Sequence, residues 1–326
     1  MKKRVILIIF LILLIISLFF ILNELDKCND GTKDRECSSL KPFYCYKKEL
    51  VKNPRDCEKI EDYKKFKKDK KETNFDYYLK GEKKSINITL YREVNNYLSN
   101  LSNSFDFKTN NNYSKKNIKL ERINNGVQDY FINELVAEII NKGDSRENQL
   151  RIATSLVQNI PYNKTKNKIF FSGIKINSSQ YPYEVLYNNK GVCQGKSELL
   201  ALLSKKIGYE TVIFYFREEN HEAVGIKCPK RYSFKDTGYC IIETTSPSII
   251  SNSENIYEQG AKLSSQPEII HISEGDSLGY KMYEYEDLEK LNKINNKIIN
   301  NKLLNPFDRI YLNRLKEKYN LYYLYK

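Results

Sequence analysis

The strongest feature of the hydrophobic pattern is an unbroken apolar run near the N-terminus. Residues 5–22 are apolar except for Ser17, which is close to the length that a helix needs to cross a bilayer. No small-residue cleavage pattern ends the run, so an uncleaved anchor is favoured over a signal peptide. Residues 2–4 are Lys-Lys-Arg, and basic residues before a span predict a cytoplasmic N-terminus. We therefore expect residues 1–23 to be a transmembrane signal anchor of the cell membrane, with the rest of the chain outside.

The pattern of hydrophobic and polar positions is weak between the predicted anchor and residue 120. Residues 24–60 contain four of the seven cysteines and are interpreted as a small disulfide-rich module, with a rigid spacer as its simplest role. Residues 61–120 are rich in Lys, Asn, Ser and Tyr. We interpret them as a linker with some ordered pieces, because they lack sustained apolar periodicity.

Regular periodicity begins near residue 126. Apolar positions at helical spacing predict a helix that Gly143 ends and a second helix that Ser145 caps. A third helix, about residues 194–207, is apolar over much of its circumference and should be buried and central. Short β-branched and aromatic runs then predict three strands. These runs are residues 211–216, 221–227 and 239–245. The order predicts an α+β domain over residues 121–275, with a buried helix on an antiparallel sheet. Residues 276–326 predict a helical tail.

Charge changes this picture little. The net charge of +13 could suggest nucleic acid as a partner. Lysine and asparagine are abundant along the whole chain, however, and no nucleic-acid-binding module stands out. We predict no nucleic-acid partner.

Cysteine usage agrees with a location outside the cell, where disulfides persist. Six cysteines are disulfide candidates: Cys28, Cys37, Cys45, Cys57, Cys228 and Cys240. The first four lack the short C-x2–4-C pairs of zinc sites, so disulfides are favoured there. Cys193 is left over, and an odd cysteine in such a chain is a candidate reactive thiol. The sequence does not give the pairing.

Cys193 lies where a tight turn, Gly191-Val-Cys-Gln-Gly195, feeds the third helix. The partial positive charge at a helix start favours the thiolate form of a cysteine. His221 and Glu243 follow on predicted strands, which is the order of a thiol nucleophile, its base and an orienting acid. Asp236 is the alternative acid but falls in a predicted loop. The other histidine, His271, fits no catalytic role and is interpreted as structural.

Several motifs in this order resemble the transglutaminase-like superfamily, a papain-like group, and most of all its membrane-anchored archaeal members. The motifs lie within residues 126–275 and include Leu156-Val-Gln-Asn-Ile-Pro-Tyr162, Tyr181-Pro-Tyr-Glu-Val-Leu186, Gly191-Val-Cys-Gln-Gly-Lys-Ser197, Asn220-His-Glu-Ala-Val-Gly225 and Ile242-Glu-Thr-Thr-Ser-Pro247. The resemblance implies that Cys193 is the nucleophile, His221 the general base and acid, and Glu243 the orienting acid.

Two departures from the family pattern matter. The third member is usually Asp, whereas Glu243 is one methylene longer. The chain has no tryptophan, so an oxyanion donor that the family takes from Trp must come from elsewhere. The backbone N–H of Cys193 is one candidate, and the side chain of Gln180 is a second.

The expected function is that of a cysteine protease or amidase that acts on protein or peptide substrates through a thioester. A protein-glutamine transamidase and a non-catalytic envelope-binding module on the same fold are the alternatives. This chemistry needs no cofactor and no metal. The expected partners are the lipid bilayer, through residues 5–22, and the protein or peptide substrate.

Strand register tests these assignments against each other. Side-chain alternation allows a Cys228–Cys240 bridge on the face opposite His221 and Glu243. If His221 and Glu243 faced each other directly, however, Cys228 would lie about four residues from the level of Cys240. We therefore expect an irregular hairpin, or else a different bridge or a different acid.

Overall fold

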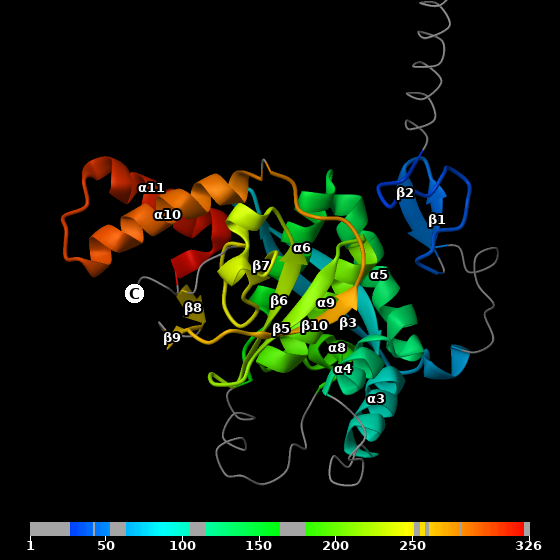
Figure 1. The fold of residues 1–326 in the computed structure, drawn as a ribbon. Helices are drawn as coiled ribbons and strands as arrows, with labels where there is room; N and C mark the ends of the chain where they lie inside the picture. The colour runs from blue at the N-terminus through cyan, green and yellow to red at the C-terminus, as the bar shows by residue number, and fades with distance from the viewer. Residues whose placement is uncertain are drawn as a thin grey trace, which may run out of the picture.

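The computed structural model describes residues 27–41, 43–52, 63–104, 115–163, 180–250, 255–257, 261–280 and 282–322, drawn as a ribbon in Figure 1. The strands are β1 (Phe43–Tyr46), β2 (Glu49–Lys52), β3 (Lys70–Leu79), β4 (Glu82–Tyr91), β5 (Thr211–Phe216), β6 (His221–Lys227), β7 (Tyr239–Ile242), β8 (Asn255–Tyr257), β9 (Ala261–Lys262) and β10 (Glu268–Ser273). The helices are α3 (Arg92–Ser104), α4 (Lys115–Ile123), α5 (Gly126–Lys142), α6 (Arg146–Asn159), α8 (Pro182–Asn188), α9 (Cys193–Ile207), α10 (Tyr283–Ile299) and α11 (Pro306–Tyr319). Short 3-10 helices are η1 (Lys64–Phe66), η2 (Lys230–Tyr232) and η3 (Phe234–Asp236).

The centre of the domain is a four-stranded sheet in the order β10-β5-β6-β7, with every neighbouring pair antiparallel. Helix α9 packs on this sheet, as the apolar run predicted. Its buried apolar side chains are Leu199, Leu200, Ala201, Leu202, Leu203 and Ile207. The mixed helix and antiparallel-sheet architecture agrees with the predicted α+β class.

Helix boundaries follow the capping signals. The side chain of Ser145 accepts a hydrogen bond from the backbone N–H of Asn148 at the start of α6, which satisfies a donor that the helix leaves free. Gly208 ends α9 with φ of +103°, a left-handed conformation that glycine adopts at low cost. These caps fix where α6 and α9 begin and end beside the sheet.

The segment that we interpreted as a linker with ordered pieces contains regular structure. Strands β3 and β4, of ten residues each, form an antiparallel hairpin. One face of the hairpin is buried and the other is exposed, as the alternation in β3 shows. Polar residues dominate the composition, yet alternate positions are apolar, among them Phe75, Tyr77, Ile86, Ile88 and Leu90. The hairpin packs on α6, and its buried face belongs to the main core.

The strand register resolves the expected conflict between the bridge and the acid. Val224 pairs with Ile242 and Ile226 pairs with Cys240, so His221 and Glu243 are not directly opposed. Cys228 and Cys240 form a disulfide, while Glu243 follows directly after β7 and reaches His221 diagonally. The assumption of direct opposition was wrong, and the bridge and the acid are compatible.

The small N-terminal module contains the β1–β2 hairpin and the Cys28–Cys45 disulfide. Cys37 is disulfide-bonded too, and Cys57 lies outside the described residues. The module contacts α5 through Asn141, whose side chain accepts from the N–H of Leu50 and donates to its carbonyl. Asn29 donates to carbonyls near the end of the same helix. The module therefore contacts α5 through polar groups, and its buried Leu40, Phe43 and Leu50 belong to the same hydrophobic cluster as the domain core.

Helices α10 and α11 form a hairpin that projects from the domain (Figure 1). Their packing buries Leu288, Leu291, Ile294, Leu312, Leu315 and Tyr319. Asp287 accepts hydrogen bonds from Tyr311, Tyr319 and Lys318, which ties the two helices together. The predicted helical tail is thus an antiparallel helix pair.

The predicted anchor, residues 5–22, lies outside the described residues. Within the described part of the chain, no helix is both long enough and apolar enough to cross a bilayer.

Gly225, in the centre of β6, gives a test of the sheet packing. A Cβ atom at this position would lie 2.5 Å from Val212 Cγ2 and 2.9 Å from the ring of Phe214. We predict that Gly225→Ala destabilises the domain by roughly 1–3 kcal/mol through overpacking, measured as a lower denaturant midpoint. Gly126→Ala is the matched control, because a Cβ there meets nothing within 4 Å. Equal midpoints for the two variants would contradict this packing.

Candidate active site

Cys193 is the first residue of α9 and is partly exposed. Among the described cysteines it is the one that is not in a disulfide. The N-cap residue, Val192, provides no side-chain hydrogen bond, so the first backbone N–H groups of α9 are available near the sulfur. The structure thus places the thiol at a helix start, as the sequence predicted.

The glycines around Cys193 allow close packing on α8. A Cβ at Gly195 would lie 2.9 Å from a methyl group of Val185, and one at Gly191 would lie 3.0 Å from the same side chain. The N–H of Gly191 donates to the carbonyl of Pro161, and its own carbonyl accepts from the N–H of Asn163. The motif therefore fixes the turn that presents Cys193.

Buried Lys196 holds the start of α9 against the end of α6. Its Nζ lies 2.6 Å from the carbonyl oxygen of Ile160 and 3.3 Å from that of Gln158. An ammonium group can be buried when it donates to several oxygens. One turn into α9, Ser197 Oγ donates to the carbonyl of Glu222 on β6 and lies 3.0 Å from Thr244 Oγ1. The Ser197 contacts tie the helix that carries Cys193 to β6, which carries His221, and to the segment after β7 that carries Glu243.

His221 and Glu243 form a buried pair, with 2.7 Å between His221 Nε2 and Glu243 Oε2. The second carboxylate oxygen, Oε1, accepts hydrogen bonds of 2.6 Å from the backbone N–H and from the hydroxyl of Thr245. Both oxygens of Glu243 are therefore held. The side chain of Glu is one methylene longer than that of Asp, and these hydrogen bonds hold it in place.

The His221 side chain is also hydrogen-bonded to the Cys193 side chain. Since Nε2 faces Glu243, Nδ1 is the ring nitrogen left for the thiol. Burial disfavours the charged imidazole, but the charge of Glu243 and the hydrogen bonds to Cys193 and Glu243 outweigh burial and raise the pKa of His221 to about 10. Burial likewise opposes ionisation of Glu243, yet His221 and Thr245 lower its pKa below the ordinary value. At neutral pH the pair is therefore imidazolium and carboxylate.

A second group of buried charges joins α4 to α9 and β6. Lys119 Nζ is 2.6 Å from Glu222 Oε1 and 3.5 Å from Glu198 Oε1, and Arg122 Nη2 is 2.8 Å from Glu198 Oε2. Burial lowers the pKa of Lys119, but the two carboxylates outweigh it and the net shift is upward. Helix α4 therefore supplies two cations that neutralise carboxylates on α9 and β6, the elements that carry Cys193 and His221.

Gln180 lies beside the start of α9, because a Cβ at Gly195 would be 3.5 Å from the Gln180 Cβ. Its backbone carbonyl accepts from Arg122, and its Nε2 donates to the carbonyl of Lys190 at 3.3 Å. Its Oε1 is buried with no hydrogen-bond partner among the described residues. The side-chain amide is thus close to the thiol helix, and one of its two N–H groups is committed to Lys190.

The two alternative residues lie in other surroundings. His271, on β10, places Nδ1 3.5 Å from the hydroxyl of Tyr239. Asp236 belongs to the irregular η3 between β6 and β7 and has φ of +58°. The structure brings together Cys193, His221 and Glu243 and leaves His271 and Asp236 outside this group.

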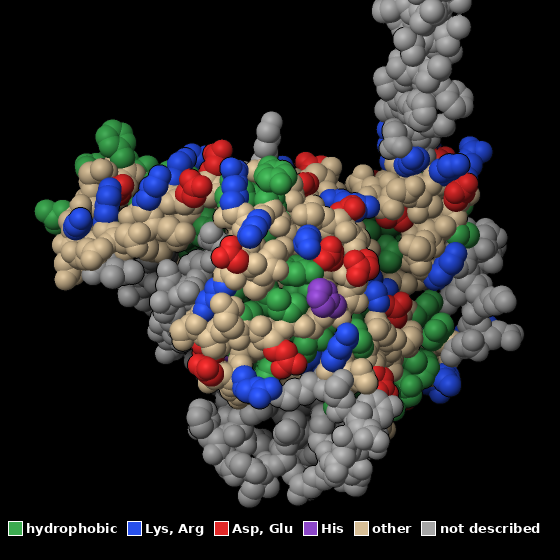
Figure 2. All heavy atoms as spheres, in the orientation of Figure 1, with side chains coloured by type: hydrophobic (Ala, Val, Ile, Leu, Met, Phe, Trp, Pro, Cys, Tyr) green, Lys and Arg blue, Asp and Glu red, His purple; other side chains and the backbone are tan. Residues whose placement is uncertain are grey.

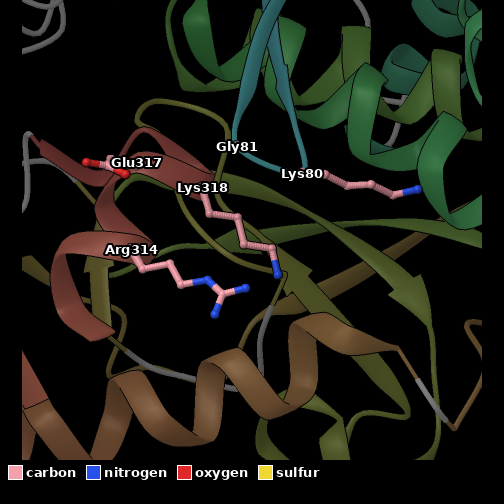
Figure 3. Close-up of a pocket in the computed structure, with 5 residues that line it drawn as sticks. All are labelled: Lys80, Gly81, Arg314, Glu317 and Lys318. Carbon is pink, nitrogen blue, oxygen red and sulfur yellow. The ribbon is translucent and has the colours of Figure 1, made fainter. Parts of the chain in front are cut away.

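A pocket of about 430 Å³ lies between the β3–β4 turn and α11, lined by Lys80, Gly81, Arg314, Glu317 and Lys318 (Figure 3). None of the candidate site residues lines it. Within the described ranges, no cluster of three or more His, Cys, Asp or Glu side chains could hold a metal ion.

The residues that support the site were not predicted from the sequence. Thr245 and Gln158 lie inside the motifs named above, and Gln158 Nε2 donates to the backbone carbonyl of Glu243. Lys119 and Arg122 lie at or just beyond the end of the segment interpreted as a linker. Their only signal was the amphipathic spacing of a short helix.

Comparison with known proteins gives a match at the level of the domain family. Residues 132–256 match the family model described as a transglutaminase-like domain, and this range includes Cys193, His221 and Glu243. No curated protein matches the chain. The solved structures that match include Legionella pneumophila LapG, with 11% identity and a TM-score of 0.27, covering 57% of this chain and 84% of that one. Its calcium-bound form has 10% identity and a TM-score of 0.27, covering 60% and 98%.

These structural likenesses are too weak to carry an argument, so the assignment rests on the family match and on the order of motifs that it spans. The chain therefore contains a transglutaminase-like domain at residues 132–256.

Proposed function

We propose that this protein is a membrane-anchored, extracytoplasmic cysteine hydrolase that cleaves peptide or amide bonds through a thioester. The observation that carries the proposal is the connected set of Cys193, His221 and Glu243 at the start of a buried helix. A thiol paired with a charged imidazole, which a buried carboxylate orients, is the arrangement that activates a cysteine nucleophile.

In the acylation step, the Cys193 thiolate attacks the carbonyl carbon of the substrate, and the carbonyl oxygen takes the negative charge. The backbone N–H of Cys193 is the first candidate donor for this oxyanion, and the free N–H of the Gln180 amide is the second. The carbon–nitrogen bond then breaks, the amine leaves with the proton of His221, and a thioester remains on Cys193.

In the deacylation step, His221 takes a proton from water and the resulting hydroxide attacks the thioester. The carbon–sulfur bond breaks, the carboxylic acid leaves, and the thiolate–imidazolium pair forms again. Water is the proposed acceptor because it is the abundant nucleophile outside a cell. Glu243 stays ionised throughout and keeps His221 in the orientation that serves both steps.

The proposed location rests on two features. Residues 5–22 form the apolar run preceded by Lys-Lys-Arg, which predicts an anchor with the following residues outside. The Cys28–Cys45 and Cys228–Cys240 disulfides support an oxidising compartment.

The first test of the proposal uses an electrophilic peptide-amide mimic that reacts with an activated thiol. We predict that wild type is labelled, that Cys193→Ala abolishes labelling, and that His221→Gln slows it on the order of 10²–10⁴-fold, because the imidazolium that pairs with the thiolate is lost. Intact-mass spectrometry measures the adduct. His271→Gln is the matched control and should react like wild type. Undiminished labelling of Cys193→Ala, or an equal loss in both histidine variants, would sink the proposal.

The length of the acid gives a second test. Glu243→Asp shortens the side chain by about 1.5 Å, one carbon–carbon bond, so one carboxylate cannot keep both the His221 and the Thr245 contacts. We predict that the second-order labelling rate falls on the order of 10²-fold, although Asp is the usual residue of the family. The labelling rate should fall less in Thr245→Val, which removes one hydrogen bond to Glu243. A Glu243→Asp variant that is labelled as fast as wild type would show that simultaneous hydrogen bonds to His221 and Thr245 are not needed for the reactivity of Cys193.

A further inference from the structure

The outer end of the α10–α11 hairpin is unusually apolar for a solvent-exposed surface. Leu303 is 90% exposed and Phe307 is 81% exposed, and Ile298 and Ile310 are also exposed. We call these four residues the hairpin tip. In the part of the chain that the structure describes, every other large exposed hydrophobic residue is a tyrosine. Figure 2 shows hydrophobic side chains protruding at this end of the hairpin, on the left of the view.

The hairpin tip is not needed to hold the hairpin together. Phe307 and Ile310 are three residues apart and share one face of α11, whereas Leu312 and Leu315 face the buried core between the helices. The hydrogen bonds to Asp287 tie the two helices together near the opposite end. The hairpin tip is therefore held away from the domain with its apolar side chains in solvent, a state that usually marks a contact surface.

Basic residues flank the hairpin tip along the chain, and we call them the basic ring. Four basic residues and one acidic residue lie from position 293 to position 309, a net charge of +3. The single acid, Asp308, already pairs with Lys297 at 2.6 Å. The remaining basic side chains of this stretch are exposed: Lys293, Lys302 and Arg309. An apolar centre inside a basic ring is complementary to a surface that is negative outside and apolar beneath.

We propose that the hairpin tip is a second membrane contact, which enters the interface of an anionic lipid bilayer. Leu303 and Phe307 would enter the boundary between headgroups and acyl chains, and the basic ring would bind the lipid phosphates. The idea goes beyond the hydrolase proposal and shares with it only the anchor at residues 5–22. An anchored domain meets the bilayer at high effective concentration, so a modest interfacial contact is enough to fix its orientation.

The absence of tryptophan from the chain makes a direct test possible. Phe307→Trp creates a single fluorescent reporter in the full-length protein, which is reconstituted into vesicles of phosphatidylcholine with or without phosphatidylglycerol and with brominated acyl chains as quencher. We expect a shift to shorter wavelength and a loss of intensity in anionic vesicles, and neither change in neutral ones. Tyr280→Trp, exposed by 69% and outside the hairpin tip, is the matched control and should show neither change.

Charge reversal tests the basic ring. Adding Lys293→Glu, Lys302→Glu and Arg309→Glu to Phe307→Trp should abolish the response in anionic vesicles. Vesicle flotation distinguishes the anchor from the second contact. If the protein floats with the vesicles while the tryptophan fluorescence of Phe307→Trp stays unquenched, the anchor is retained and the proposed second contact is wrong. Equal quenching in neutral vesicles would also overturn it. So would a shift in lipid-free detergent that grows with protein concentration, because it would identify a second copy of the chain as the occupant.

Discussion

The hydrogen-bonded pair of His221 and Glu243 is the interaction on which the rest of the site depends. A buried ion pair is retained only when its geometry is good and its remaining hydrogen-bonding groups are satisfied. Here Thr245 satisfies the second carboxylate oxygen and the Cys193 side chain bonds to the imidazole. The raised pKa of His221 follows from this arrangement, and so does its capacity to hold a proton next to a sulfur nucleophile at neutral pH.

Much of the surrounding structure holds Cys193, His221 and Glu243 in their relative positions. Ser197 ties α9 to β6 and to Thr244, and Lys196 ties the same helix to the end of α6. The cations of α4 neutralise the buried carboxylates of Glu198 on α9 and Glu222 on β6. Helix α4 and the β3–β4 hairpin lie before residue 132, where the family match begins. The packed unit that holds the site is therefore larger than the segment that matches the family model.

The parts that could be predicted from the sequence have strong local signals. The apolar run after Cys193 and the glycine at 208 predicted α9, and chain order brought His221 and Glu243 to the same sheet. The β3–β4 hairpin was missed because lysines and asparagines alternate with its apolar residues and hide the period of two. The diagonal approach of Glu243 was missed because the register depends on pairing between strands, which β7 sets by facing Ile226 with Cys240. The roles of Lys119 and Arg122 needed the tertiary structure, since their carboxylate partners are about 80 to 100 residues away.

The most direct test of the account is the protonation state of His221 in solution, read by nuclear magnetic resonance of ¹⁵N-labelled histidine in the His271→Gln background. With a single imidazole, the nitrogen shifts report its charge without ambiguity. The account predicts an imidazolium at pH 8 that loses its proton only as the pH approaches about 10, with a lower midpoint in Cys193→Ala because the sulfur contact is gone. A neutral ring at pH 8, with a midpoint near the ordinary histidine pKa of about 6.5, would contradict it.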